Sequence, residues 1–168
     1  MDAPAPTATT LWHRVLTDPQ LRDLPFKIET EEPDRIILSP HKARHSLQQA
    51  RLVALLLEHL SDGEPAVEFA VETPRGVKVP DVVWISEATA ATLSLDDEAS
   101  RVMPEIVIEV LSRSNAPREM DRKMRLYFDG GAREVWLCDA DGRLRFFGAD
   151  GERDGSAFAP ALPRRVPS

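Results

Sequence analysis

The sequence predicts an α/β (α+β) fold in which a central mixed β-sheet is flanked by helices. Short segments with strand-like alternation or with continuous β-branched residues occur along most of the chain, and two or three longer segments with helical periodicity lie between them. At 168 residues, 42% of them hydrophobic, the chain is long enough for one domain with a sizeable core. We therefore expect a single domain over residues 1–168, with residues 1–9 and 160–168 irregular.

The composition excludes several classes of protein. No run of about 18 apolar residues could span a membrane, and the first ten residues lack the features of a secretory signal, so we expect a cytoplasmic protein without membrane contact. The single cysteine, Cys138, cannot form an internal disulfide and is expected to be a buried, inert thiol. A net charge of −7 argues against a general polyanion-coating surface, but a metal-dependent phosphodiesterase can combine acidic residues with a local basic patch.

The first elements are a short helix, two strands and a long helix. The short helix is predicted over residues 10–17, and the segments 26–30 and 35–39 are typical of strands joined by a polar turn. Ser39 is suited to cap the long helix, with Pro40 at its first position and the "SDG" sequence at its end. Helical spacing indicates that one apolar face of this helix packs on the sheet, formed by Ala43, Leu47, Ala50, Ala54 and Leu57.

A hairpin of residues 66–72 and 77–85 follows, because the "TPRG" sequence between these segments is typical of a turn. Residues 86–102 are polar and rich in small side chains, which indicates a surface segment with a weak helix. The strand predicted at residues 106–111 carries aliphatic side chains on both faces and is therefore expected inside the sheet.

The last elements are a helix and a second hairpin. Asn115 is a suitable N-cap for a helix over residues 116–129, and two glycines would end it. Strands are predicted at residues 134–138 and 144–147, and the "DADG" sequence between them is a strong hairpin signal.

Two carboxylates interrupt these apolar strands. Alternation in "VKVPDVVWIS" puts Asp81 on an otherwise aliphatic strand face, and Glu109 lies inside the core strand. A buried carboxylate without a partner is costly, but both could share one divalent cation, and hard oxygen ligands suit Mg²⁺ or Mn²⁺. The alternative is that each carboxylate pairs with an arginine or reaches solvent at a strand end.

A lysine lies on the buried face of the helix that follows Glu109. Lys123 shares a helical stripe with Ala116, Met120 and Tyr127, whereas most other charges of this helix lie off it. Its ammonium group could orient or help to deprotonate a water molecule, or balance the charge of a phosphate. The alternative is that the long side chain reaches past the stripe to solvent.

Several segments, within residues 26–147, resemble the Uma family of restriction-endonuclease-like proteins, a branch of the PD-(D/E)xK nuclease superfamily: "GVKVPDVVWIS", "PEIVIEVLSRSN", "EMDRKMRLYFDGGAREVWLCD" and the amino-terminal "KIETEEPDRIILSPHKARHSLQQARLVALL". The resemblance implies a restriction-endonuclease-like fold and an endonuclease that hydrolyses DNA phosphodiester bonds with Mg²⁺ or Mn²⁺. The alternative is a catalytically inactive module of this fold that binds a protein or a nucleic acid. Many enzymes of this architecture are dimers, so a homodimer is also open.

The resemblance also implies roles for individual residues. Asp81 and Glu109 would be the metal-binding catalytic acids, and the backbone carbonyl of Val110 would be a further ligand. The superfamily lysine position holds Leu111 here, and the family resemblance moves that role to Lys123.

Three further polar residues are weaker expectations for the lining of the site. His45 and Gln48 match a polar position on the superfamily helix before the sheet, although both could simply form the polar edge of an amphipathic helix. Glu29 in the first strand could also line the site, with solvent exposure near the turn as the alternative.

Overall fold

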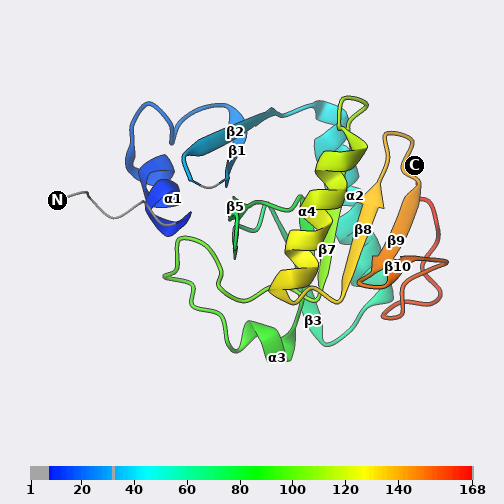
Figure 1. Cartoon of the computed structure of the whole chain (residues 1–168). Coiled ribbons are helices and arrows are strands. Elements are labelled where there is room, and N and C mark those ends of the chain that lie inside the picture. The colour runs from blue at the N-terminus through cyan, green and yellow to red at the C-terminus, as the bar shows by residue number, and fades with distance from the viewer. Residues whose placement is uncertain (1–7, 32, 168) are drawn as a thin grey trace.

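The computed structural model describes residues 8–31 and 33–167, whose arrangement Figure 1 shows. The helices are α1 (Ala8–Thr17), α2 (Ala43–His59), α3 (Glu87–Ala90) and α4 (Pro117–Gly130). The strands are β1 (Phe26–Glu31), β2 (Arg35–Pro40), β3 (Gly63–Val67), β4 (Val71–Thr73), β5 (Gly76–Lys78), β6 (Val82–Ser86), β7 (Ile106–Val110), β8 (Glu134–Cys138), β9 (Leu144–Gly148) and β10 (Gly151–Arg153).

Six strands form the central sheet in the order β10-β9-β8-β7-β6-β3. Neighbouring strands are antiparallel except β7 and β8, which are parallel. A parallel pair needs a crossover connection, and α4 provides it between these two strands. The predicted mixed sheet flanked by helices is confirmed.

Helices α2 and α4 cover opposite faces of this sheet (Figure 1). Successive strand residues point to opposite faces, so Ile106 and Ile108 of β7 join the hydrophobic cluster of α2, whereas Val107 joins that of α4. By the same alternation Glu109 faces α4. The carboxylate therefore lies on the side of the sheet that the helix carrying Lys123 covers.

The predicted hairpin of residues 66–72 and 77–85 is present but is bent into two sheets. β3 and β6 pair in the central sheet, whereas β4 and β5 pair in a separate two-stranded sheet. Both parts share one register, since Val67 pairs with Val82 and Val71 with Lys78. The bend is therefore a local break in a continuous hairpin, and residues 79–81 form one side of it.

Because of this break, the prediction that Asp81 shares one continuous strand face with its aliphatic neighbours is wrong. Val77 and Val79 pack with α1, whereas Val83 and Ile85 belong to the cluster that α4 covers. Asp81 lies at the corner between the two groups, where the backbone leaves the central sheet. The corner removes Asp81 from the strand ladder and leaves its carboxylate beside the end of β7.

The predicted start and face of α2 are wrong. β2 continues through Pro40, and α2 begins at Ala43 after Lys42, so Ser39 does not cap it. Leu47 and Leu57 of the predicted buried stripe are 56% and 59% exposed, and its three alanines are also exposed. The buried residues are Gln48, Leu52, Leu55 and Leu56. This helix is apolar on two sides, and the side with three bulky leucines packs on the sheet because it offers more apolar area.

Smaller differences concern the ends of elements. α1 begins at Ala8, so Ala8 and Thr9 are helical rather than irregular. α4 begins after Ala116 without a side-chain cap, because the Asn115 Oδ1 instead accepts bonds from the backbone N–H and the hydroxyl of Ser112. Gly131 ends α4 in the left-handed region at a φ of 111°, as the predicted glycine stop requires.

The carboxyl-terminal region contains both confirmed and unpredicted features. β8 and β9 form the predicted hairpin, and β10 is an additional edge strand. Residues 160–167 contain no helix or strand, as expected, yet Leu162 and Val166 are buried in the cluster of α2. Cys138 is buried as predicted, and burial raises the pKa of its thiol to about 12. No helix of the described residues is long and apolar enough to cross a membrane.

Candidate active site

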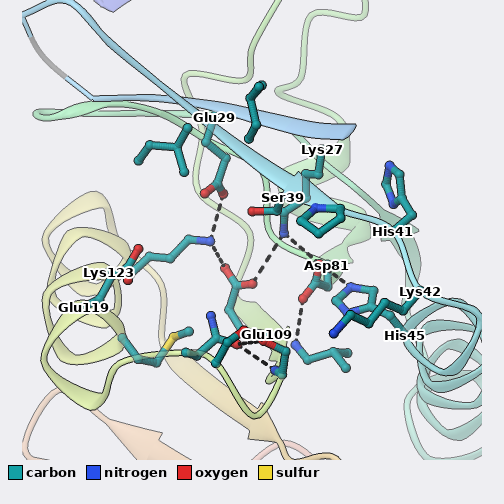
Figure 2. Close-up of a pocket in the computed structure, with 18 residues that line it drawn as sticks. Lys27, Glu29, Ser39, His41, Lys42, His45, Asp81, Glu109, Glu119 and Lys123 are labelled. Atoms are coloured by element: carbon teal, nitrogen blue, oxygen red, sulfur yellow. Dashed lines mark hydrogen bonds and ion pairs between the residues drawn. The ribbon is translucent and has the colours of Figure 1, made fainter. Parts of the chain in front are cut away.

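A hollow of about 270 Å³, the site pocket, lies between the β1–β2 hairpin, the start of α2, the end of β7 and α4. Three of its carboxylates and two of its lysines form ion pairs with one another, namely Glu29, Asp81, Glu109, Lys27 and Lys123 (Figure 2). The two lysines reach the carboxylates from opposite sides, Lys27 from β1 and Lys123 from α4. The fold thus gathers residues from four separate parts of the chain.

Asp81 is held at the corner of the bent hairpin by three donors. Its side chain is 1% exposed, and its Oδ2 accepts the backbone N–H of Val110 at 2.7 Å. Its Oδ1 lies 2.8 Å from the Lys27 ammonium and 2.9 Å from the His45 Nε2. Burial alone would raise the pKa of Asp81, but the His45 and Lys27 contacts outweigh it and hold the pKa below its ordinary value. Asp81 is therefore an ionised, fixed carboxylate.

Glu109 is a buried acid within β7, on the face of the sheet that α4 covers. It is 2% exposed, and its Oε1 lies 2.8 Å from the Lys123 ammonium and accepts the Tyr127 hydroxyl at 2.5 Å. Burial raises the pKa of Glu109 above its ordinary value, and the nearby lysines lower it by less. At Glu109, burial together with the neighbouring Asp81 and Glu29 carboxylates therefore outweighs the two lysines.

Lys123 bridges two carboxylates and does not reach past the stripe to solvent. Its ammonium lies 2.8 Å from both Glu29 Oε1 and Glu109 Oε1. Burial would lower the pKa of Lys123, but the two carboxylates outweigh it and raise the pKa above its ordinary value. Glu29 is buried rather than exposed, and it also accepts the backbone N–H of Val79 at 2.7 Å. Lys123 is thus held as a cation by its two partners.

Lys27 was not predicted as a site residue. Its ammonium lies 2.8 Å from Asp81 Oδ1 and 3.8 Å from Glu109 Oε2, so one cation already contacts both predicted metal ligands. Burial would lower the pKa of Lys27, but Glu109 and Asp81 outweigh it, so the pKa is raised. The available signal was strand alternation, because Lys27 shares a face of β1 with Glu29 two residues later.

Some of the remaining predicted residues line the site pocket and others do not. His45 and Val110 line the site pocket. Gln48 does not: its side-chain amide donates to the backbone carbonyls of Asp139 and Ala140, so its prediction as a lining residue is wrong. Leu111 packs against the cluster of α4 and donates its N–H to Cys138, which agrees with an apolar role at this position. Asp81 and Glu109 form their ion pairs with lysines rather than arginines.

Comparisons with known proteins identify the family and the fold of the chain. The model of the Uma2 family, described as "Putative restriction endonuclease", matches residues 19–153. The chain belongs to this family. A crystal structure described as "a putative nuclease belonging to DUF820" from Anabaena variabilis is similar with a TM-score of 0.68, at 16% identity over 83% of this chain and 87% of the other. That similarity shows that the two chains share a fold. A search of curated proteins found no match.

The donor set of this Uma2 chain fits a hydrated divalent cation better than a fully protein-bound one. Among the described residues, no group of three His, Cys, Asp or Glu side chains could hold a metal ion. Mg²⁺ needs no such cage, because it usually keeps several waters and binds one or two carboxylates together with substrate phosphates. The Lys27 ammonium marks a position from which one cation reaches both Asp81 and Glu109. The residues therefore fit such an ion if Lys27 gives up that position.

Proposed function

We propose that this protein is a Mg²⁺- or Mn²⁺-dependent endonuclease that hydrolyses phosphodiester bonds of DNA. One observation carries the proposal: two buried carboxylates, Asp81 and Glu109, are both within reach of a single cation, and Lys123 lies 2.8 Å from one of them. Membership of a nuclease family supports the same chemistry. Asp81, Glu109 and Lys123 would be the catalytic residues.

Each of these side chains has a specific task in the proposed reaction. The Val110 N–H and His45 fix the orientation of Asp81, and the Tyr127 hydroxyl fixes that of Glu109. Because Lys123 retains its proton between two carboxylates, it would orient the attacking water and offset negative charge rather than remove a proton. A bound divalent cation would lower the pKa of a coordinated water and withdraw charge from the phosphate.

A nicking assay on supercoiled plasmid tests the proposal. The wild-type protein should convert the plasmid to the open-circular form with Mg²⁺ or Mn²⁺ and not with EDTA. Asp81→Asn and Glu109→Gln keep the shape of each side chain, and each should reduce the rate by at least about 100-fold, as expected when a catalytic group is lost. Absence of nicking by the wild type, or nicking by both variants at the wild-type rate, would overturn the proposal.

A second candidate function is a non-catalytic module of this fold that binds a protein or a nucleic acid. The position of Lys27 favours it, because an ammonium group between the two acids already neutralises part of the charge that would attract a metal ion. The same assay separates the candidates when Lys27→Met is added. A non-catalytic module stays inactive in both forms, whereas an endonuclease retains metal-dependent nicking in the wild type.

A further inference from the structure

Two adjoining hollows next to the site pocket form a second feature, which we call the basic groove. The first hollow, of about 340 Å³, is lined by Lys42, Arg44 and Arg113 among others, and the second, of about 390 Å³, by Arg44, Arg51 and Arg165. All five cationic side chains are exposed. The basic groove therefore contrasts with the net charge of −7 for the whole chain.

The cations of the basic groove have no ion-pair partner among the described residues. Most other arginines of the described residues form ion pairs, for example Arg145 with Glu152 and Arg164 with Asp154. None of the five groove cations forms an ion pair with a described residue. Among the described lining residues, Asp141 is the one carboxylate. Free cations on both banks of a groove can bind an external anion.

The basic groove is continuous with the site pocket. Its first hollow shares Lys42, His45, Val110 and Ser112 with the site pocket, and its two hollows share Arg44, Gln48 and Ala140. One bank is the start and first half of α2, and the other consists of the loop after β7, the turn between β8 and β9 and the carboxyl-terminal segment. A ligand that follows the groove therefore leads directly to Asp81.

We propose that the basic groove binds the sugar–phosphate backbone of duplex DNA and guides one strand to the site pocket. This inference rests on the proposed endonuclease function. Arginine suits phosphate because its planar fork makes paired hydrogen bonds. Arg44 and Arg51 are separated by two turns of α2, about 10 Å, which corresponds to the rise of about three base pairs, each about 3.4 Å, along the axis of a DNA duplex.

The lining favours a duplex over single-stranded nucleic acid. Single-strand binding sites normally stack bases on aromatic side chains. Among the described residues that line the basic groove there is no Phe, Tyr or Trp. The groove thus offers contacts to phosphates and no platform for exposed bases.

A pair of double variants with equal charge change tests the groove. Arg51→Gln with Arg165→Gln removes two groove cations. The control, Arg125→Gln with Arg164→Gln, removes an exposed helix arginine and the neighbour of Arg165 in sequence, neither of which lines the groove. Binding of a short fluorescein-labelled DNA duplex is measured by anisotropy in EDTA, so that cleavage plays no part, between about 50 and 200 mM salt.

The groove variant should bind the duplex at least about tenfold more weakly than the wild type, and the slope of log K against log salt should fall by about 2. The control should keep the wild-type affinity and slope. Equal effects of both double variants, no binding by the wild type at about 50 mM salt, or tighter binding of single-stranded DNA or duplex RNA would overturn the groove assignment.

The two proposals can fail separately. If the protein binds duplex DNA through the groove but never nicks plasmid, the groove assignment stands and the proposed endonuclease function is contradicted. If the protein nicks plasmid but the groove variant binds DNA like the control, the endonuclease function stands and the groove assignment is contradicted.

Discussion

Lys27 is the residue that most changes the chemistry expected of the site. The sequence predicts two acids that share a divalent cation, and the structure has an ammonium group in contact with both of them. The energy of two unit charges about 4 Å apart is about 4 kcal/mol at an effective dielectric constant of 20. A metal ion must therefore compete with a nearby positive charge that the protein itself supplies.

Replacement of Lys27 by methionine should tighten metal binding. The variant keeps the side-chain length but removes the competing charge, so the dissociation constant for Mn²⁺ should fall by at least about tenfold, or about 1.4 kcal/mol. Isothermal titration calorimetry without DNA measures this directly. Lys42→Met is the matched control, because it removes the same charge from the rim of the site pocket without a contact to either acid. Unchanged or weaker Mn²⁺ binding by Lys27→Met would contradict the prediction.

The three residues that the sequence predicts as catalytic are those that interrupt an apolar pattern. Asp81, Glu109 and Lys123 each place a charge where neighbours of the same face are hydrophobic, and all three lie in the site pocket. Lys27 was missed and Glu29 was only a weaker expectation, because the β1 face that carries them is charged throughout and resembles a solvent-exposed face. Only the packing of the β1–β2 hairpin over the end of the sheet buries them, and that is a tertiary effect.

At the scale of elements, α2 shows where periodicity alone is insufficient. Its sequence contains two apolar stripes with helical spacing, and either could be assigned to the sheet. The predicted stripe contains three alanines, whereas the observed one contains Leu52, Leu55 and Leu56. Strand and hairpin positions were more predictable, because turn sequences such as "TPRG" and "DADG" fix them locally.

The observed face of α2 makes a direct prediction for stability. Leu52→Ala and Leu56→Ala each remove a fully buried side chain and should lower the free energy of unfolding by about 2–5 kcal/mol. Leu47→Ala and Leu57→Ala alter exposed side chains and should change it by no more than about 0.5 kcal/mol. Urea unfolding of the four variants measures these differences. Larger losses for Leu47→Ala and Leu57→Ala than for Leu52→Ala and Leu56→Ala would support the helix face predicted from the sequence instead.

Glu105 connects the end of β6 and the start of α3 to the start of β7. Its carboxylate accepts bonds from the Ser86 N–H at 3.1 Å, from the Ser86 hydroxyl and from the Thr89 hydroxyl at 2.5 Å. Burial would raise the pKa of Glu105, but these hydrogen bonds outweigh it and lower the pKa. A lowered pKa means that the ionised carboxylate stabilises the folded state.

The stability contributed by Glu105 should therefore depend on pH. Glu105→Gln should lower the free energy of unfolding by about 1–2 kcal/mol at neutral pH. Since the folded pKa lies below the unfolded one, this difference should be complete above about pH 4.3 and decline as the pH falls through the folded pKa. Urea unfolding over this range measures it, with Glu64→Gln on the exposed side of β3 as a control. A difference that does not change with pH would contradict a role for the charge.

At the scale of the whole molecule, the site depends on a fold that joins distant segments. Sequence order separates Lys27 from Lys123 by most of the chain, yet Glu109 lies within 3.8 Å of one ammonium and 2.8 Å of the other. The two lysines balance most of the charge of the three acids without a metal ion. The fold should therefore be stable without a metal ion, and metal binding should add to that stability rather than create it.

Thermal melting tests this last expectation. A ligand that binds only the folded state at 100 times its dissociation constant adds about 2.7 kcal/mol, or about 5–10 °C for a chain of this size. The wild type should thus melt cooperatively in EDTA and melt higher by about this amount with saturating Mn²⁺. Asp81→Asn should melt cooperatively as well but should lose the Mn²⁺ increment, because it removes one of two carboxylate ligands. An equal increment in both proteins would locate metal binding elsewhere, and the absence of any increment in the wild type would exclude the proposed metal site.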